Sequence, residues 1–325
     1  MINRMEIVLT RRYKINFIFS MVISSLAAVF TAFASPYFFN KILPGINYTG
    51  ITAAVLNFFI THLFITRKYR KRKRIAAAPF PEEWKTILSD LVIFYKQLGD
   101  DDKYLFEKKV QIFLDEKIIT GIETGVDDST RLLIASAAVI PVFRISDWEY
   151  NSLGEILVYP DRFNSDYSFT DDERNILGMV VSNTSSLIIS KKELFKGFSA
   201  MDGSNTAIHE FMHKIDEEDG EIDGLPVLML NSKNIEEWKK ARETEIGLIR
   251  SGHSDMNPYA LSGHAEFLAV SGEYFFESPE KLKKRNPELY RIMRILFNQD
   301  PASLIKSETA EIFKRKRKKM QKKRR

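Results

Sequence analysis

The sequence predicts an α+β protein in which a small sheet is combined with many helices and is preceded by a two-helix transmembrane hairpin. Three observations lead to this prediction. Two uncharged segments near the N-terminus are each long enough to cross a bilayer, helical spacing of apolar residues recurs along most of the remaining chain, and only a few short runs have strand composition. The 325 residues suffice for a membrane anchor and one globular domain.

The predicted hairpin consists of residues 15–40 and 42–66, which contain no Asp, Glu, Lys or Arg. Each segment exceeds the roughly 20 residues that a helix needs to cross the hydrocarbon layer. Lys41 and the helix breakers in residues 43–45 suit a turn between the two spans. A cleaved signal peptide fits less well, because the apolar run is too long and a second one follows directly.

Basic residues indicate the orientation of the hairpin. They precede the first span within residues 4–14 and follow the second at residues 67–74, and such clusters favour the cytoplasmic side. The sequence therefore predicts a multi-pass protein of the inner (cytoplasmic) membrane, with the rest of the chain facing the cytoplasm. Two buried helices of a soluble core would explain the hydrophobicity but not the flanking charges.

The predicted organisation has four parts: the hairpin with its basic flanks (1–74), a linker (75–81), a globular domain (82–305) and a basic tail (306–325). The net charge of +5 is concentrated in the second basic flank and the tail, so nucleic acid is not an expected partner of the globular domain. The tail could bind nucleic acid, but contact with anionic lipid or disorder is the favoured interpretation. Because the chain has no cysteine, any metal ligands must be His, Asp or Glu.

The globular region should begin with two amphipathic helices, at residues 82–98 and 103–118. Residues 130–143 indicate a buried helix, although their β-branched content leaves a strand possible. The best strand candidates are residues 155–159 and 186–190. Further helices are expected at 205–216, 235–249, 265–276 and, as one or two helices, 279–297.

One of these helices carries the motif HExxH, formed by His209, Glu210 and His213. The i, i+4 spacing places both imidazoles on one helical face, about one turn apart, as two ligands of a single zinc require. Glu210 lies beside them and could act as general base toward a water at the metal. A solvated helix with two incidental histidines is the alternative, and the apolar residues around the motif argue against it.

A catalytic zinc takes three protein ligands, so a third must come from another element. The candidates downstream are His253, His264, Glu266 and Glu273. A carboxylate in a helix as apolar as residues 265–276 is costly unless it is paired or bound to metal, which favours Glu266 or Glu273. Spacing alone does not choose between these two.

The segments around this motif resemble the Mlc titration factor A family of cytosolic zinc peptidases, a zincin group whose catalytic core is similar to that of anthrax lethal factor. The resemblance is carried by residues 202–216, the loop that leads to Gly224-Leu225-Pro226, and residues 259–282 and 288–301, and it extends weakly back to about residue 83. It implies a zincin-like metallopeptidase domain that covers about two thirds of the chain and excludes the hairpin and the tail.

The resemblance also implies roles for individual residues. His209, His213 and Glu266 would bind Zn²⁺, and Glu210 would be the catalytic base. Tyr259 would occupy the position of a tyrosine that stabilises the oxyanion, a role that suits a phenol donor. A packed aromatic beside Pro258 is the alternative for this tyrosine.

The chain departs from the family pattern at two places, with His264 where a proline is common and Gly272 where a serine precedes Glu273. We expect His264 at the surface and Glu273 bonded to a buried partner or to a histidine ligand. Asp216 would either orient a ligand or face water. The acidic run 216–223 lacks the ligand order of an EF-hand and should form a solvated loop.

The sequence thus predicts a membrane-anchored cytoplasmic zinc peptidase that acts on a peptide or protein substrate. The rival hypothesis is a zinc-containing binding module that sequesters a transcriptional repressor at the membrane, since the resembled family is named for capturing one. A channel is disfavoured because the spans contain no intramembrane charge. Nucleotide chemistry and serine hydrolysis have no motif to support them.

Overall fold

The computed structural model describes residues 6–42, 49–146, 148–160 and 185–304. The chain divides into two compact units, Met1–Pro79 and Phe80–Arg325. The predicted basic tail and the predicted turn at residues 43–45 lie outside the described residues.

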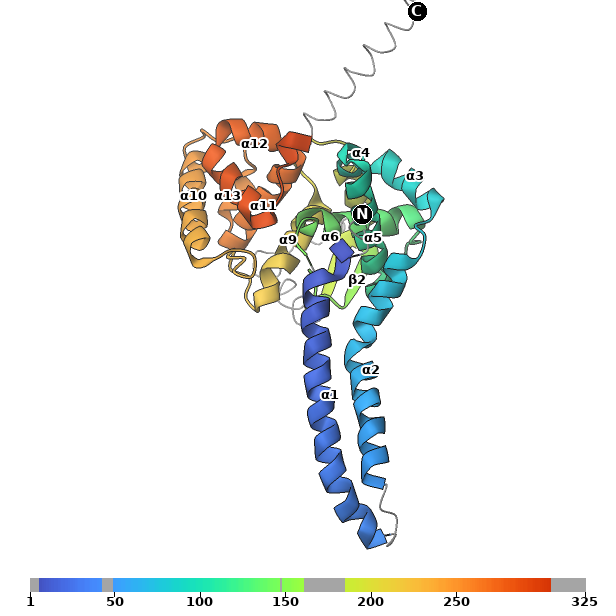
Figure 1. The fold of residues 1–325 in the computed structure, drawn as a ribbon. Helices are drawn as coiled ribbons and strands as arrows, with labels where there is room; N and C mark the ends of the chain where they lie inside the picture. The colour runs from blue at the N-terminus through green and yellow to red at the C-terminus, as the bar shows by residue number, and fades with distance from the viewer. Residues whose placement is uncertain (1–5, 43–48, 147, 161–184, 305–325) are drawn as a thin grey trace, which may run out of the picture. The chain divides into compact units, whose positions relative to one another are not determined.

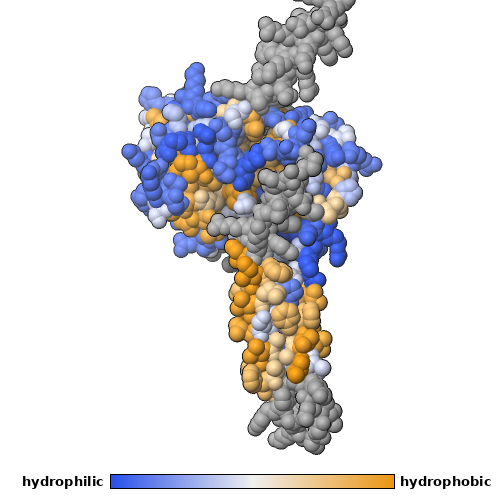
Figure 2. Space-filling view, viewed as in Figure 1, coloured by the Kyte–Doolittle hydropathy of each residue, from blue (hydrophilic) through white to orange (hydrophobic). Residues whose placement is uncertain are grey.

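The first unit contains two long helices, α1 (Glu6–Ile42) and α2 (Thr49–Ala77), which pack along each other (Figure 1). A hydrogen bond of 2.5 Å joins Asn57 Nδ2 to Thr31 Oγ1 between them. Most apolar side chains of the pair point outward, which gives the helices their apolar surface in Figure 2.

Among the described residues, one segment is long and apolar enough to cross a membrane, Ile15–Ala34 within α1. Its 20 residues correspond to a helix of about 30 Å, the thickness of the hydrocarbon layer. A membrane-spanning role for α2 stays a prediction. The helix α2 continues to Ala77, so the first residues of the predicted linker are helical.

The second unit is mostly helical. The α-helices among its described residues are α3 (Glu82–Leu91), α4 (Ile93–Gln97), α5 (Asp100–Glu116), α6 (Asp128–Val142), α8 (Lys191–Gly197), α9 (Thr206–Asp216), α10 (Ser232–Arg250), α11 (His264–Glu277), α12 (Pro279–Arg285) and α13 (Pro287–Phe297). Two short 3₁₀ helices, η1 (Glu217–Asp219) and η2 (Pro258–Leu261), follow α9 and precede α11.

The sheet has three parallel strands in the order β1 (Ile118–Gly121), β2 (Glu155–Tyr159) and β3 (Ser186–Ser190). The two predicted strands are confirmed with their predicted bounds. In both, alternate residues are buried, as expected of strands with one face on the core. The sequence analysis missed β1, because four residues directly after a helix show no period and Ile118 had been assigned to that helix.

The first predicted helix, 82–98, is wrong as a single element. Val92 is extended (φ −108°, ψ 98°) and separates α3 from α4. Its side chain is fully buried, as are most of Phe94 and Tyr95. The free energy gained by burying these side chains exceeds the free energy that a continuous helix through Val92 would add. A β-branched residue has a low helix propensity, so little is lost at the break.

The segment 130–143 is the helix α6, and the alternative of a strand is wrong. Asp127 caps the helix by accepting the backbone N–H of Thr130 at 2.8 Å. Every residue from Leu132 to Val142 is buried, because α3, α5, α8 and α9 pack around α6. Figure 1 shows this helix in the middle of the unit. Such a helix is apolar on all sides and has no amphipathic period.

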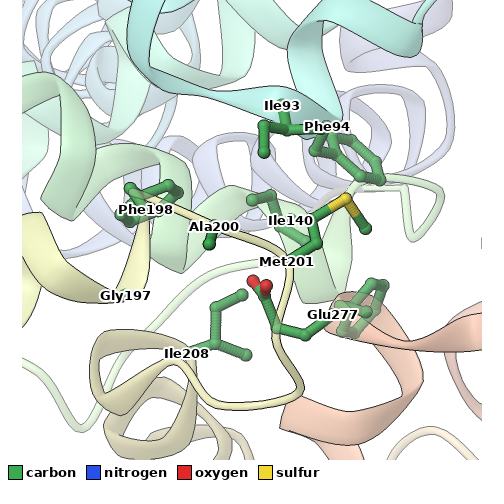
Figure 3. A pocket seen from close by; sticks show the side chains of 10 residues that line it. Ile93, Phe94, Ile140, Gly197, Phe198, Ala200, Met201, Ile208 and Glu277 are labelled. Carbon is green, nitrogen blue, oxygen red and sulfur yellow. The ribbon is translucent and has the colours of Figure 1, made fainter.

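A small cavity between α4, α6, α8 and α11 contains one acidic side chain, Glu277 (Figure 3). The cavity volume is about 20 Å³, which is room for about one water molecule, and its other side chains are apolar. Oε1 of Glu277 accepts from Asn205 Nδ2 at 3.2 Å, whereas Oε2 has no hydrogen-bond partner among the described residues. Burial raises the pKa of Glu277 to about 8.

We expect Glu277→Gln to stabilise the protein at pH 8 and to leave its stability at pH 5 almost unchanged. The folded-state pKa lies above the unfolded value of 4.5. As the pH rises from about 4.5 to 8, Glu277 loses its proton in the unfolded chain but keeps it in the folded chain. The free energy of unfolding therefore falls across that window. The amide does not ionise, and its gain at pH 8 should be about 1 to 3 kcal/mol.

Thermal unfolding of the full-length protein at the two pH values measures this difference. Glu236→Gln, at an exposed position of α10, is the control and should change neither value. Equal pH dependence of unfolding in wild type and Glu277→Gln would contradict the prediction.

Candidate metal centre

The helix α9 begins at Asn205, whose side-chain oxygen accepts the backbone N–H of Ile208 at 3.2 Å. Its apolar face is buried against the core, where the ring of Phe211 lies 5.8 Å from that of Phe113 and 5.5 Å from that of Tyr150. The opposite face carries His209, Glu210 and His213, all partly buried. Amphipathic packing of one helix therefore orients the whole HExxH motif.

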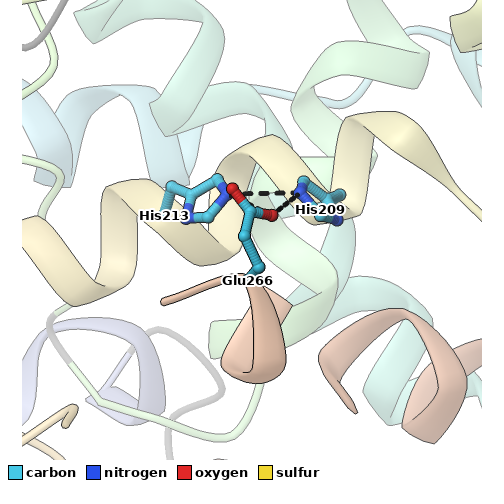
Figure 4. Close-up of side chains that lie close together, drawn as sticks. All are labelled: His209, His213 and Glu266. Carbon is cyan, nitrogen blue, oxygen red and sulfur yellow. Dashed lines mark hydrogen bonds and ion pairs between the residues drawn. The ribbon is translucent and has the colours of Figure 1, made fainter. Parts of the chain in front are cut away.

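The helix α11 brings Glu266 to this face of α9 (Figure 4). Glu266 Oε2 lies 3.0 Å from His209 Nε2 and 3.4 Å from His213 Nε2, and the two Nε2 atoms are 3.2 Å apart. The structure thus brings together the three predicted donors, in a group that could hold a metal ion.

Glu273 lies two turns after Glu266 on the same face of α11 and contacts the other side of His209. Its Oε1 is 2.5 Å from His209 Nδ1, and its Oε2 accepts the backbone N–H of Asn205 at 2.9 Å. This is the histidine contact that the sequence analysis expected for Glu273. A proton on Nδ1, donated to Glu273, would leave the Nε2 lone pair available to a metal ion that displaces the Nε2 proton shared with Glu266.

The other two candidates for a third donor lie away from the group. His253 and His264 are exposed; His253 Nδ1 contacts Ser251 Oγ at 3.0 Å, and His264 Nε2 lies 3.9 Å from Glu243. The expected surface position of His264 is therefore confirmed.

Three carboxylates face the two imidazoles, and no Lys or Arg among the described residues pairs with them. Burial opposes protonation of His209, but hydrogen bonds with Glu266 and Glu273 outweigh it and raise its pKa to about 10. For Glu266, burial is in turn outweighed by the two histidines, which lower its pKa to about 2. Burial raises the pKa of Glu210. An excess of negative charge of this kind favours a bound cation.

Tyr259 lies on η2, next to α11 in space. Its ring centroid is 6.0 Å from that of His209, and 46% of the residue is exposed. The backbone N–H of Tyr259 donates to Asn257 Oδ1 at 3.0 Å, which fixes the turn that presents the ring. Tyr259 therefore borders the group from the solvent side and is not packed in the core.

The loop after α9 is held in place by two hydrogen bonds of the Gly224 backbone. Its N–H donates to Asp216 Oδ2 at 2.7 Å, and its carbonyl accepts from Trp238 Nε1 at 2.8 Å. Asp216 is fully buried, so the alternative that it faces water is wrong. Its carboxylate is directed at the loop backbone, and we assign to it the role of holding the loop.

A side chain at Gly224 would disrupt this fastening. Its φ is +73°, and a Cβ there would lie 2.2 Å from the carbonyl oxygen of His264, two residues before Glu266. The loop that follows α9 in the chain therefore packs against the start of α11 in space. Gly224 is part of the loop that carries the family resemblance, but the sequence assigned no role to it and none to Trp238. The glycine before Leu225-Pro226, after an acidic run, was the available signal of a tight turn.

The fold and the group of donors are those of a metallopeptidase-like domain, with an HExxH helix and a glutamate from a later helix. The chain belongs to the glucose-regulated metallo-peptidase M90 family, whose family model matches residues 66–298. The expected family relationship is confirmed by individual relatives as well.

Mlc titration factor A of Pectobacterium atrosepticum is 30% identical over 241 residues, which are 70% of this chain and 89% of the relative. The protein of the same name from Cronobacter sakazakii is 26% identical over 241 residues, 70% and 88% of the two chains. Uncharacterized protein slr2042 of Synechocystis is 28% identical over 245 residues, 71% and 89% of the two chains.

We expect Gly224→Ala to lower the stability of the protein and to weaken metal binding. The Cβ meets the His264 carbonyl and the left-handed φ adds strain, so the loss should exceed about 1 kcal/mol. Gly220→Ala is a matched control, because Gly220 has a φ of +102° with open space around its Cβ position. Thermal unfolding and zinc titration measure both effects, and equal losses in the two variants would contradict the role assigned to Gly224.

Proposed function

We propose that this protein is a membrane-anchored zinc peptidase in which His209, His213 and Glu266 bind the metal and Glu210 is the general base. The observation that carries the proposal is the spacing of the three donor atoms, 3.0, 3.2 and 3.4 Å. Tetrahedral bonds of the length that zinc forms with nitrogen and oxygen place the ligand atoms about 3.3 Å apart. The described side chains therefore fit zinc without rearrangement.

The chemistry of the donors supports zinc over other ions. Two imidazole nitrogens and one carboxylate oxygen form the ligand set of many catalytic zinc sites. Calcium and magnesium prefer sites built from oxygen donors alone. Three protein ligands leave a fourth position for water or substrate, which favours a catalytic over a structural site.

When bound, zinc would lower the pKa of water and polarise the carbonyl of the scissile peptide bond. Glu210 lies between the two histidines in the sequence, where it could accept a proton from the attacking water and pass it to the leaving amine. Glu273 holds His209 in the required tautomer. The phenol of Tyr259 can donate a hydrogen bond to the oxyanion.

The site would act at the cytoplasmic face of the inner membrane. The apolar span in α1 supports an anchor, and the basic residues of α2 favour a cytoplasmic position for the domain that begins after this helix. In this proposal residues 1–74 form the two-span anchor, residues 82–305 form the peptidase domain, and residues 75–81 and 306–325 serve as linker and basic tail. The substrate is a peptide or protein.

A second candidate function is the binding of a regulatory protein. Several relatives are named Mlc titration factor A, which suggests that they bind a repressor called Mlc. This chain would then hold a transcriptional repressor at the membrane. Glu210, a carboxylate that can act as a base beside the metal donors, favours catalysis over binding alone, because a structural zinc needs no such group.

We expect the full-length protein, purified in detergent, to contain one zinc per chain and to lose it in Glu266→Ala. Removing one of three protein ligands leaves the metal poorly held. Glu273→Gln should keep the metal but bind it roughly 10 to 100 times more weakly. Elemental analysis and titration with a chelator give both values. His264→Ala is the control, and loss of zinc in that variant instead would refute the ligand set.

We expect Glu210→Gln to keep its zinc and to lose peptide hydrolysis by a factor of about 100 or more. The amide has nearly the shape of the carboxylate but does not accept the proton from water. Cleavage of peptides by wild type should also stop when a chelator is added. Full activity of Glu210→Gln would contradict the mechanism, and a zinc-containing wild type that cleaves nothing would favour the binding module.

A further inference from the structure

Exposed apolar side chains gather around the metal centre. The second unit exposes seven large hydrophobic side chains among its described residues, and five of them belong to two segments, the loop after α9 and η2. We name these five the apolar patch: Ile222, Val227, Leu228, Tyr259 and Leu261, with exposed fractions between 37% and 61%. The remaining two, Ile118 and Ile295, lie on β1 and α13.

The two segments meet beside the metal donors. Gly224 contacts the carbonyl of His264, and every member of the patch lies within five residues of one of these two. Three residues of extended chain span at most about 11 Å, so Val227 and Leu261 lie close to that contact. Glu266 follows His264 by two residues, and the Tyr259 ring is next to His209. Tyr259 therefore borders the reacting centre, and the other members of the patch lie on the two segments that meet next to it.

The loop is built to expose its apolar residues. Gly224, Pro226 and Leu230 are buried, which anchors the backbone on both sides of Val227 and Leu228. The N–H of Val227 donates to the carbonyl of Leu225 at 2.7 Å, and the N–H of Met229 donates to that of Pro226 at 3.0 Å. These tight turns force the two intervening side chains outward. Exposed apolar side chains grouped in this way mark binding sites more often than chance.

We propose that the apolar patch binds apolar side chains of the peptide substrate beside the bond that is cleaved. This inference rests on the proposed function and names the class of substrate. Residues that flank the scissile bond extend from the catalytic groups past Tyr259 and the two segments that carry the patch, and the apolar character of these segments favours Leu-like or aromatic side chains there.

Charge near the patch favours a peptide over the membrane as its occupant. Three acidic residues, Asp219, Glu221 and Asp223, flank Ile222 and form no ion pair with a lysine or arginine of the described residues. Carboxylates at this position repel anionic lipid headgroups. They also repel acidic side chains of a peptide, so the preferred substrate is apolar and not acidic near the scissile bond.

Peptide cleavage by the full-length protein in lipid nanodiscs tests this specificity. In a mixture of peptides of random sequence, wild type should cut next to apolar residues and avoid acidic ones. Leu228→Ser should lower kcat/KM for such peptides roughly tenfold. Ile295→Ser, which removes an exposed apolar side chain on α13, is the matched control and should leave the rate unchanged. Cleavage without apolar preference, or a preference that Leu228→Ser does not alter, would overturn the inference and leave the peptidase itself intact.

A binding measurement separates the inference from the proposed function. The chain has no cysteine, so Leu228→Cys in a Glu210→Gln background can carry a single environment-sensitive fluorophore. An apolar peptide should change its emission, while an acidic peptide should not, and a label at Ile295→Cys should respond to neither. If wild type cleaves no peptide, the proposed peptidase function is wrong. The fluorescence response then still tests whether the patch binds apolar peptides. If spin-labelled lipid quenches the fluorophore and peptides do not change its emission, the patch contacts the membrane and the inference is wrong.

Discussion

The contact of both ring nitrogens of His209 with glutamates of α11 is the interaction on which the site depends. Nδ1 meets Glu273 and Nε2 meets Glu266, and the two glutamates lie seven residues apart on one helical face. A single imidazole therefore fixes the rotation of α11 relative to α9. Burying these carboxylates is unfavourable in isolation, and the charge of the imidazoles, or of a bound cation, offsets that cost.

Close packing of α9 and α11 makes this contact possible, and a small residue at position 272 favours it. A Cβ at Gly272 would lie 2.7 Å from Cγ of Met212, in the middle of the HExxH helix. The small residue lets the two helices approach until the side chain of Glu273 reaches His209. The Gly272-Glu273 pair thus serves the geometry of the site. Gly224 plays the corresponding role where the loop meets the start of α11.

The peptidase domain and the anchor contribute separately to the proposed function. The family model begins at residue 66 and so covers every residue of the metal centre, whereas α1 lies outside the match. The residues of the metal centre therefore lie within the part of the chain that matches the family. Its proposed place at the membrane derives from an apolar helix that the family model does not include.

Features that depend on local geometry could be predicted from the amino-acid sequence. The spacing of His209 and His213, the strands β2 and β3 and most helices follow from the periods of the helix and the strand, and the apolar span follows from the length of an uncharged run. Three other features emerged from the folded chain alone: which glutamate faces which nitrogen of His209, the burial of Asp216 against the loop, and the break of the first predicted helix at Val92. These features depend on contacts between residues far apart in the chain, and such contacts leave no period in the sequence.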